Sequence, residues 1–453
     1  MKKSNFSDFF PDKNQNHKNL FIMQRKIISE LLVWKNKKDR KPLILNGARQ
    51  IGKTYIIKEF GKQEFTNVVY INLERNMPVR EIFDGDISPS RIIPALENDA
   101  NQRIKPNETL IFLDEIQACE RALTSLKYFC EDAPEYYVVA AGSLLGVAIN
   151  REKYSFPVGK VNELYMFPFD FEEFLWALDR KNLAEEIKKH YATNEAMHTS
   201  IHKLALKFFK QYLVTGGMPA AIKNLIETES FIEVANAQTD IYNEYVADMA
   251  KYSNTATSIK IRACYNSIPA QLAKENRKFQ YKMVQKGGTA TIFGESIEWL
   301  NFAGTVLKCQ KITEGNIPIA VYQYFPDFKL YMADVGMLTL KSQIPVSLLL
   351  AEGNEDNTFM GAFTENYVAQ AFAAKKIPLF YWKNDNTAEV DFVLQKDVDV
   401  IPVEVKRGIN TRSKSLNIFA KQYNCPYAIR ISQKNFGFEN GIKSVPLYAV
   451  FCI

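Results

Sequence analysis

The segment that most constrains the fold is residues 47–54, with the sequence Gly-Ala-Arg-Gln-Ile-Gly-Lys-Thr. It has the spacing of the phosphate-binding loop motif G-x-x-x-x-G-K-[ST]. An apolar run precedes it at 43–45, and residues 55–60 have the pattern of a helix. A strand, a glycine-rich loop and a helix in this order are the context that such a motif requires. The sequence therefore predicts an α/β domain that binds nucleotide phosphates.

Each feature of the motif has a physical role. The glycines let the backbone turn tightly, so that successive N–H groups point at phosphate oxygens. Lys53 is expected to reach the β- and γ-phosphates, and the Thr54 hydroxyl to bind Mg²⁺. We therefore expect ATP and Mg²⁺ as the ligands. The candidate phosphate-binding residues are Gly47, Ala48, Arg49, Gln50, Ile51, Gly52, Lys53 and Thr54.

A second motif follows about sixty residues later. Residues 109–113 form a near-continuous apolar run, which is typical of a strand buried on both faces of a parallel sheet. The run ends in Asp114 and Glu115, at the strand end where α/β sheets place their ligands. Asp114 is predicted to hold Mg²⁺ and Glu115 to polarise the attacking water. For Glu115, capping of the following helix is the structural alternative.

Residues 138–143 form another buried strand that ends in Ser143, a candidate sensor of the γ-phosphate or the attacking water. Together, four segments resemble the bacterial and archaeal AAA-type ATPases whose C-terminal half is known only as a domain of unknown function with nuclease-like features. The resemblance implies a sheet of five parallel strands, Asp114 and Glu115 as the Walker B pair, and Ser143 in the sensor-1 place. The four segments are residues 49–50, 113–117, 142–143 and 155–160.

An arginine finger is harder to place. AAA ATPases commonly take this residue from a neighbouring subunit. Arg151 and Lys160 are the nearest basic residues, and a solvated loop charge is the alternative interpretation for each. The sequence leaves both the finger and assembly into an oligomer open.

Length and composition indicate the class of protein and the number of domains. At 453 residues with 47% apolar and 24% charged residues, we expect a globular protein of about three domains. The predicted division is 1–195, an AAA-type ATPase; 196–350, a helical and winged-helix-like part; and 351–453, a nuclease-like α/β part. Six cysteines without C-x-x-C spacing favour the reducing cytoplasm. No apolar run approaches the length of a membrane span, and no secretory signal is expected.

Residues 251–290 carry a large excess of positive charge. Eight basic residues face only Glu275, so the segment has a net charge of 8 − 1 = +7, against +6 for the whole chain. A helix at 297–300 and a strand at 306–309 follow, an order that resembles a winged helix-turn-helix. We expect Arg277, Lys278 and Lys282 to contact double-stranded DNA. A charged, solvated face and contact with a protein partner are the alternatives.

The last hundred residues contain a second candidate site. Residues 363–372 have the pattern of an amphipathic helix that carries Glu365 near its start. In a predicted hairpin of the strands 389–394 and 400–406, Glu404 and Lys406 share a face and Asp391 lies beside them. This arrangement resembles restriction-endonuclease-like nucleases, with acids for Mg²⁺ and a lysine for the attacking water. Chance spacing, or a nuclease fold that has lost its chemistry, are the alternatives.

Two functional hypotheses follow. In the first, ATP hydrolysis drives an action on nucleic acid. In the second, the chain is a regulatory nucleotide switch that binds protein partners and carries an inactive nuclease fold.

Overall fold

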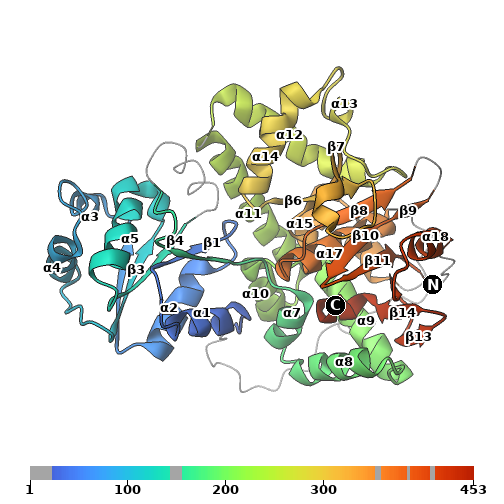
Figure 1. The fold of residues 1–453 in the computed structure, drawn as a ribbon, viewed down its shortest axis with the longest axis horizontal. Coiled ribbons are helices and arrows are strands. Elements are labelled where there is room, and N and C mark those ends of the chain that lie inside the picture. The colour runs from blue at the N-terminus through green and yellow to red at the C-terminus, as the bar shows by residue number, and fades with distance from the viewer. Residues whose placement is uncertain (1–22, 143–155, 252, 352–358, 385–387, 409–413) are drawn as a thin grey trace. The chain divides into compact units, whose positions relative to one another are not determined.

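A computed structural model describes the chain except for residues 1–22, 143–155, 252, 352–358, 385–387 and 409–413. Its contacts divide the described residues into two compact units. The P-loop unit comprises 25–167 together with 302–304, and the C-terminal unit comprises 168–301 and 305–453 together with residues 23–24. Figure 1 shows the P-loop unit mainly in blue to teal and the C-terminal unit in green to red.

The P-loop unit is built on a sheet of five parallel strands in the order β2-β3-β4-β1-β5. The register aligns the ends of neighbouring strands, with Asn72 opposite Asp114 and Asp114 opposite Ala141. The carboxyl ends of the strands therefore meet at one edge, as ligand-binding α/β sheets require. This sheet confirms the predicted α/β class. The strands are β1 Leu43–Asn46, β2 Asn67–Asn72, β3 Thr109–Asp114, β4 Tyr137–Ala141 and β5 Asn162–Tyr165.

Helices cover this sheet with apolar faces. Ile92 of α4 and Leu126 of α5 are fully buried in one cluster with Ile111 and Val138 of the sheet. Every residue of β3 is buried, which explains its uninterrupted apolar sequence. The helical elements of this unit are α1 Ile27–Lys35, α2 Lys53–Glu64, α3 Met77–Glu81, α4 Pro89–Ala100, η2 Ile116–Ala118 and α5 Glu120–Asp132.

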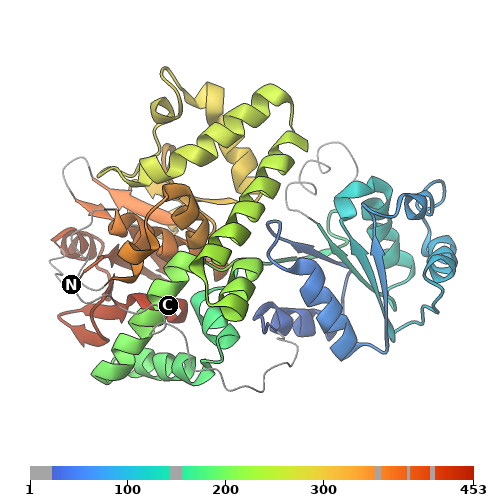
Figure 2. The same ribbon diagram turned by 180° about the vertical axis from the view of Figure 1, so that it is seen from behind.

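The C-terminal unit begins with helices. The first of them, α7, starts with a capping box in which Asp170 Oδ1 accepts from the Glu173 amide at 2.9 Å. In the view from behind, α9 and α11 are drawn in green in front of the orange strands (Figure 2). The helices up to the first strand are α7 Phe171–Ala177, α8 Lys181–Thr193, α9 Thr199–Thr215, α10 Pro219–Thr228, α11 Phe231–Lys251, α12 Thr255–Leu272, α13 Tyr281–Val284 and α14 Ala290–Phe302.

Two sheets complete this unit. The first has the order β7-β6-β8-β9 and the second the order β10-β11-β12-β14-β13. The predicted strand 389–394 is divided at Asp391, since β9 belongs to the first sheet and β10 to the second. The strands are β6 Val306–Ile312, β7 Gln323–Met332, β8 Phe380–Lys383, β9 Glu389–Val390, β10 Phe392–Lys396, β11 Asp399–Val405, β12 Ala428–Ser432, β13 Gly437–Glu439 and β14 Ile442–Pro446.

Helix α17, Met360–Ala374, differs from its predicted amphipathic form. Every residue from 362 to 372 is buried, because the helix packs on β6, β7 and β11 and on η4 as well. A helix surrounded by other elements needs no polar face, so its polar residues must find partners inside the protein. The remaining helical elements are η3 Ile319–Tyr322, α15 Val335–Ser342, α16 Val346–Leu350, α18 Lys414–Gln422 and η4 Leu447–Cys452.

The order α12, α13, α14, β6, β7 has the three helices and the hairpin that a winged helix-turn-helix requires. The hairpin is not free, however, because β6 also pairs with β8 from the last part of the chain. Strands from both sides of residue 350 thus share one sheet. The winged-helix identity and the division into 1–195, 196–350 and 351–453 stay predictions. Among the described residues, no helix is long and apolar enough to cross a membrane.

Candidate functional sites

The loop after β1 has the backbone that phosphate binding needs. Gly52 has φ 92°, a conformation that side chains with a Cβ atom rarely adopt, and it directly precedes α2. At Gly47, with φ 152°, an added Cβ would lie 2.4 Å from the carbonyl oxygen of Met166. Only glycine fits there. The loop therefore turns onto the N-terminus of α2, where free N–H groups and the helix dipole favour an anion.

Lys53 lies at the start of α2 and turns back into the loop. Its Nζ donates to the carbonyl oxygens of Gly47 at 3.0 Å and Ala48 at 2.7 Å. Ala48 and Ile51 are buried, and Gln50 adopts a left-handed backbone with φ 62°. The ammonium group is thus held at the loop where the motif would place β- and γ-phosphates.

Asp114 receives two hydroxyl groups at one carboxylate oxygen. Thr54 Oγ1 donates to Asp114 Oδ2 at 2.8 Å, and Tyr70 OH donates to the same oxygen at 3.0 Å. The two predicted Mg²⁺ ligands therefore lie together at the end of β3. Tyr70 was not predicted from the sequence; its position in β2, next to β3 in the sheet, brings it there.

Glu115 follows in a left-handed backbone conformation with φ 54°. Its side chain accepts no hydrogen bond from the backbone of the following helical turn; instead, Gln117 Nε2 donates to Glu115 Oε2. The structure thus gives no support to the alternative in which Glu115 caps the next helix. Gln117 is a second residue that motif reasoning did not assign.

Arg25 supports the loop from before β1. This arginine is 7% exposed, and its guanidinium donates to the carbonyl oxygens of Ile51 at 3.1 Å and Phe167 at 2.6 Å. Lys160, a candidate for the arginine-finger place, lies on the surface in an ion pair with Glu131 at 2.8 Å. Ser143 and Arg151 lie outside the described residues.

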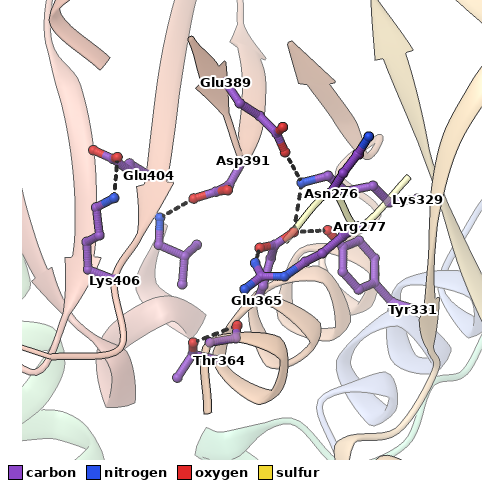
Figure 3. Close-up of polar contacts among 12 residues, drawn as sticks. Asn276, Arg277, Lys329, Tyr331, Thr364, Glu365, Glu389, Asp391, Glu404 and Lys406 are labelled. Carbon is purple, nitrogen blue, oxygen red and sulfur yellow. Dashed lines mark hydrogen bonds and ion pairs between the residues drawn. The ribbon is translucent and has the colours of Figure 1, made fainter. Parts of the chain in front are cut away.

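In the C-terminal unit, Glu365 is at the centre of a buried ion cluster (Figure 3). It is 1% exposed, and its Oε1 accepts from Lys329 Nζ at 2.9 Å and from Tyr331 OH. Arg277 forms an ion pair with its other oxygen. Lys329 in turn lies 2.8 Å from Glu389 Oε1. Sequence reasoning missed Lys329 and Glu389, although a lysine inside the apolar stretch 328–332 is a signal, because buried lysines need a partner.

The other three predicted nuclease residues lie nearby. β10 and β11 pair as the predicted hairpin, and continuation of their register places Asp391 opposite Glu404. Lys406 Nζ lies 2.6 Å from Glu404 Oε1, and Asp391 Oδ2 accepts from the Val405 amide at 2.8 Å. Burial raises the pKa of Asp391, while Lys329 and the Val405 amide act in the opposite direction.

A metal that bridges these acids does not fit the contacts. Both oxygens of Glu365 are engaged by cations, and Glu404 is paired with Lys406. The described residues include no group of three or more His, Cys, Asp or Glu side chains placed to hold a metal ion. Glu365, expected as an additional metal-binding acid, has Arg277, Lys329 and Tyr331 as its partners, and its role as a metal ligand stays a prediction.

Two of the three expected DNA contacts are also used inside the protein. Arg277 reaches Glu365, and Lys278 forms an ion pair with Asp327. Phe279 N donates to Phe328 O at 2.8 Å, so this segment runs along β7. Other basic residues of the segment remain on the surface. The exposed ones are Lys251, Lys260, Arg262, Lys274, Lys282 and Lys286.

Comparison with known proteins supports the fold of the P-loop unit. Residues 39–175 match the model of a family described as an AAA domain. Residues 206–346 and 360–450 each match a family described as a domain of unknown function. No curated protein is significantly similar in sequence. With its parallel five-stranded sheet, the P-loop unit therefore has the AAA-type P-loop fold.

Solved structures give only distant likenesses. The Walker-type ATPase PABY2304 of Pyrococcus abyssi is 13% identical with a TM-score of 0.45, over 74% of this chain and 99% of that one. The Aeropyrum pernix ORC1 protein in complex with DNA is 14% identical with a TM-score of 0.28, over 73% and 93%. The Thermotoga maritima RuvB Holliday junction branch migration motor is 13% identical with a TM-score of 0.30, over 63% and 89%.

Proposed function

We propose that the P-loop unit binds Mg-ATP and hydrolyses it. The observation that carries this proposal is the hydrogen bond from Thr54 Oγ1 to Asp114 Oδ2, beside a loop into which Lys53 turns. Hydroxyl and carboxylate oxygens suit Mg²⁺, and a lysine in a glycine loop suits phosphate. A purely structural strand-to-helix turn has no need of all three groups in one place.

In this proposal each residue has a defined task. Lys53 exchanges the carbonyl oxygens of Gly47 and Ala48 for phosphate oxygens. Thr54 and Asp114 are the residues that would hold Mg²⁺, which supplies charge neutralisation for the β- and γ-phosphates. Glu115 orients the attacking water and accepts its proton, with Gln117 fixing the direction of the carboxylate.

Replacement of Glu115 by Gln tests hydrolysis separately from binding. We expect Glu115→Gln to bind Mg-ATP with near wild-type affinity and to lose turnover by roughly 100-fold or more, since the amide cannot accept the proton. Glu108→Gln is the matched control, because Glu108 is exposed and forms its ion pair with Lys105 at the surface. Wild-type turnover in Glu115→Gln, or no turnover in the wild type, would contradict the proposal.

Contact with double-stranded DNA is a second candidate function. It is favoured by the five exposed basic residues between 260 and 286, because exposed lysine and arginine groups bind phosphates without regard to sequence. A protein partner with an acidic surface is the alternative occupant. Nuclease chemistry at Asp391, Glu404 and Lys406 is the weaker hypothesis, because the expected third acid, Glu365, is engaged by Lys329 and Arg277.

A further inference from the structure

Lys329 is a fully buried lysine inside a strand. It is 1% exposed and lies in β7 between Phe328 and Leu330, which are also buried. Lysine is almost never fully buried without a charged partner. A buried ammonium group that is kept must have its charge balanced and its donors satisfied.

The balance comes from two acids on different elements. Lys329 Nζ lies 2.9 Å from Glu365 Oε1 on α17 and 2.8 Å from Glu389 Oε1 on β9. Figure 3 shows the ammonium group between the two carboxylates, with Asp391 close by. Tyr331, two residues further along β7, donates to Glu365 from the same face of the strand.

The cluster is electrically neutral without any further ion. Its cations are Lys329, Arg277 and Lys383, of which Lys383 lies 2.9 Å from Glu389 Oε2. Its anions are Glu365, Glu389 and Asp391, so the sum of formal charges is 3 − 3 = 0. A divalent cation added among these acids would have to remove Lys329 from both of its partners.

The fold makes room for this pairing. Gly361 lies one helical turn before Glu365 on α17, and a Cβ added there would lie 2.8 Å from Arg277 Nη2. The missing side chain lets the guanidinium lie over the first turn of the helix and reach Glu365. Two separate segments, 276–278 and β7, thus deliver one cation each to the same glutamate.

We propose that Lys329 is a built-in cation of the C-terminal unit. Its ammonium group occupies the place between the carboxylates that a divalent metal would need, so the unit holds its acids together without a metal. A consequence is that Glu365 and Glu389 do not add metal ligands to the hairpin that presents Asp391, Glu404 and Lys406.

Thermal melting with and without Mn²⁺ tests this proposal. The full chain is used without nucleotide and with Asp114→Asn, which removes the metal-binding acid predicted for the P-loop unit. In this background we expect millimolar Mn²⁺ to leave the melting temperature unchanged. Lys329→Ala should melt lower by roughly 6 °C or more and should regain part of the loss with Mn²⁺, because it leaves a vacancy among three carboxylates.

Lys278→Ala is the matched control, since Lys278 lies beside Lys329 but pairs with Asp327 near the surface. Its melting temperature should be close to that of the parent protein and should not change with Mn²⁺. If Lys329→Ala does not fold, the double variant Lys329→Met with Glu365→Gln removes both charges and should melt above Lys329→Met alone.

Three results would overturn the proposal. The first is stabilisation of the parent protein by Mn²⁺ that is abolished by Asp391→Asn. The second is equal melting of Lys329→Ala and Lys278→Ala. The third is plasmid cleavage with Mg²⁺ or Mn²⁺ that Glu365→Gln abolishes while this variant melts near the parent protein. None of these readouts depends on ATP hydrolysis, so failure here leaves the proposed function untouched.

Discussion

The carboxylate of Asp114 accepts hydrogen bonds from hydroxyl groups on two different elements, Thr54 on α2 and Tyr70 on β2. Its other oxygen accepts from the Glu115 amide at 3.1 Å. Three donors keep the side chain in one orientation. A metal-binding acid prepared in this way needs little rearrangement when its ligand arrives.

Replacement of Gln117 tests whether the orientation of Glu115 matters for hydrolysis. Its Nε2 group donates to Glu115 Oε2, so removal of the amide frees the carboxylate to turn away from the loop. We expect Gln117→Ala to lower kcat by roughly 10- to 100-fold while KM for ATP changes little, because only the orientation of the base is lost. Steady-state kinetics decides. A raised KM at unchanged kcat would instead place Gln117 in nucleotide binding.

Among the elements, β7 and α17 carry the buried ion pair of the C-terminal unit, Lys329 with Glu365. Both oxygens of Glu365 and the ammonium group of Lys329 are paired inside the protein. Such a cluster adds specificity, because each member satisfies the others only when all segments dock correctly. The contribution of this cluster to the free energy of unfolding should depend on pH through Glu389.

Burial by itself would raise the pKa of Glu389, but Lys329 and Lys383 outweigh it and lower the pKa to about 2, from a usual value of 4.5. Glu389 therefore stabilises the folded state above about pH 4.5, and this contribution is lost as the pH falls toward 2. We expect Glu389→Gln to lose up to about 3 kcal/mol at pH 7 and to show a flatter decline on acidification.

Melting curves between pH 7 and pH 2 measure this difference. Glu439→Gln is the control, because Glu439 is exposed on β13. It should keep the wild-type profile. If Glu389→Gln followed the wild-type profile as well, the ion cluster would contribute nothing to stability.

Elements with strong local signals were predictable from the sequence. The apolar runs that became β1, β3 and β4, the loop at 47–54 and the hairpin of β10 and β11 all have short-range signatures. The break at Asp391 and the burial of α17 were not, because both depend on which elements pack around them. The periodicity of apolar residues indicates which face of a helix is buried. It does not indicate that other elements cover the remaining faces as well.

The same distinction separates the two candidate sites. Lys53, Thr54 and Asp114 come together because parallel strands end at one edge, a rule that the sequence pattern already invokes. Arg277 and Lys329 reach Glu365 from segments that are 88 and 36 residues away in the chain. No local pattern links them, so a basic segment looked like a surface for DNA where part of it is a buried ion cluster.

For the molecule as a whole, the exposed basic residues between 260 and 286 lead us to predict binding to double-stranded DNA. Replacement of Lys274, Lys282 and Lys286 by Ala should weaken binding to all duplex sequences about equally. The slope of affinity against salt should flatten by about one unit per lost contact. Gel-shift titration at several salt concentrations measures both effects.

The control for this experiment replaces three exposed lysines elsewhere in the same unit, Lys181, Lys189 and Lys203. This variant has the same change in net charge and should bind DNA much as the wild type does. Equal loss in both variants would indicate a general charge effect. No measurable affinity at low salt would favour the protein-partner alternative.

The most direct test of the nucleotide site is calorimetric titration of Mg-ATP into the wild type and Lys53→Ala. We expect the variant to bind roughly 10- to 100-fold more weakly, because it loses the ammonium group that the loop now holds with the carbonyl oxygens of Gly47 and Ala48. Its melting curve without nucleotide should remain close to that of the wild type. Equal affinity in the two proteins would contradict the assignment of residues 47–54 as the site of the β- and γ-phosphates.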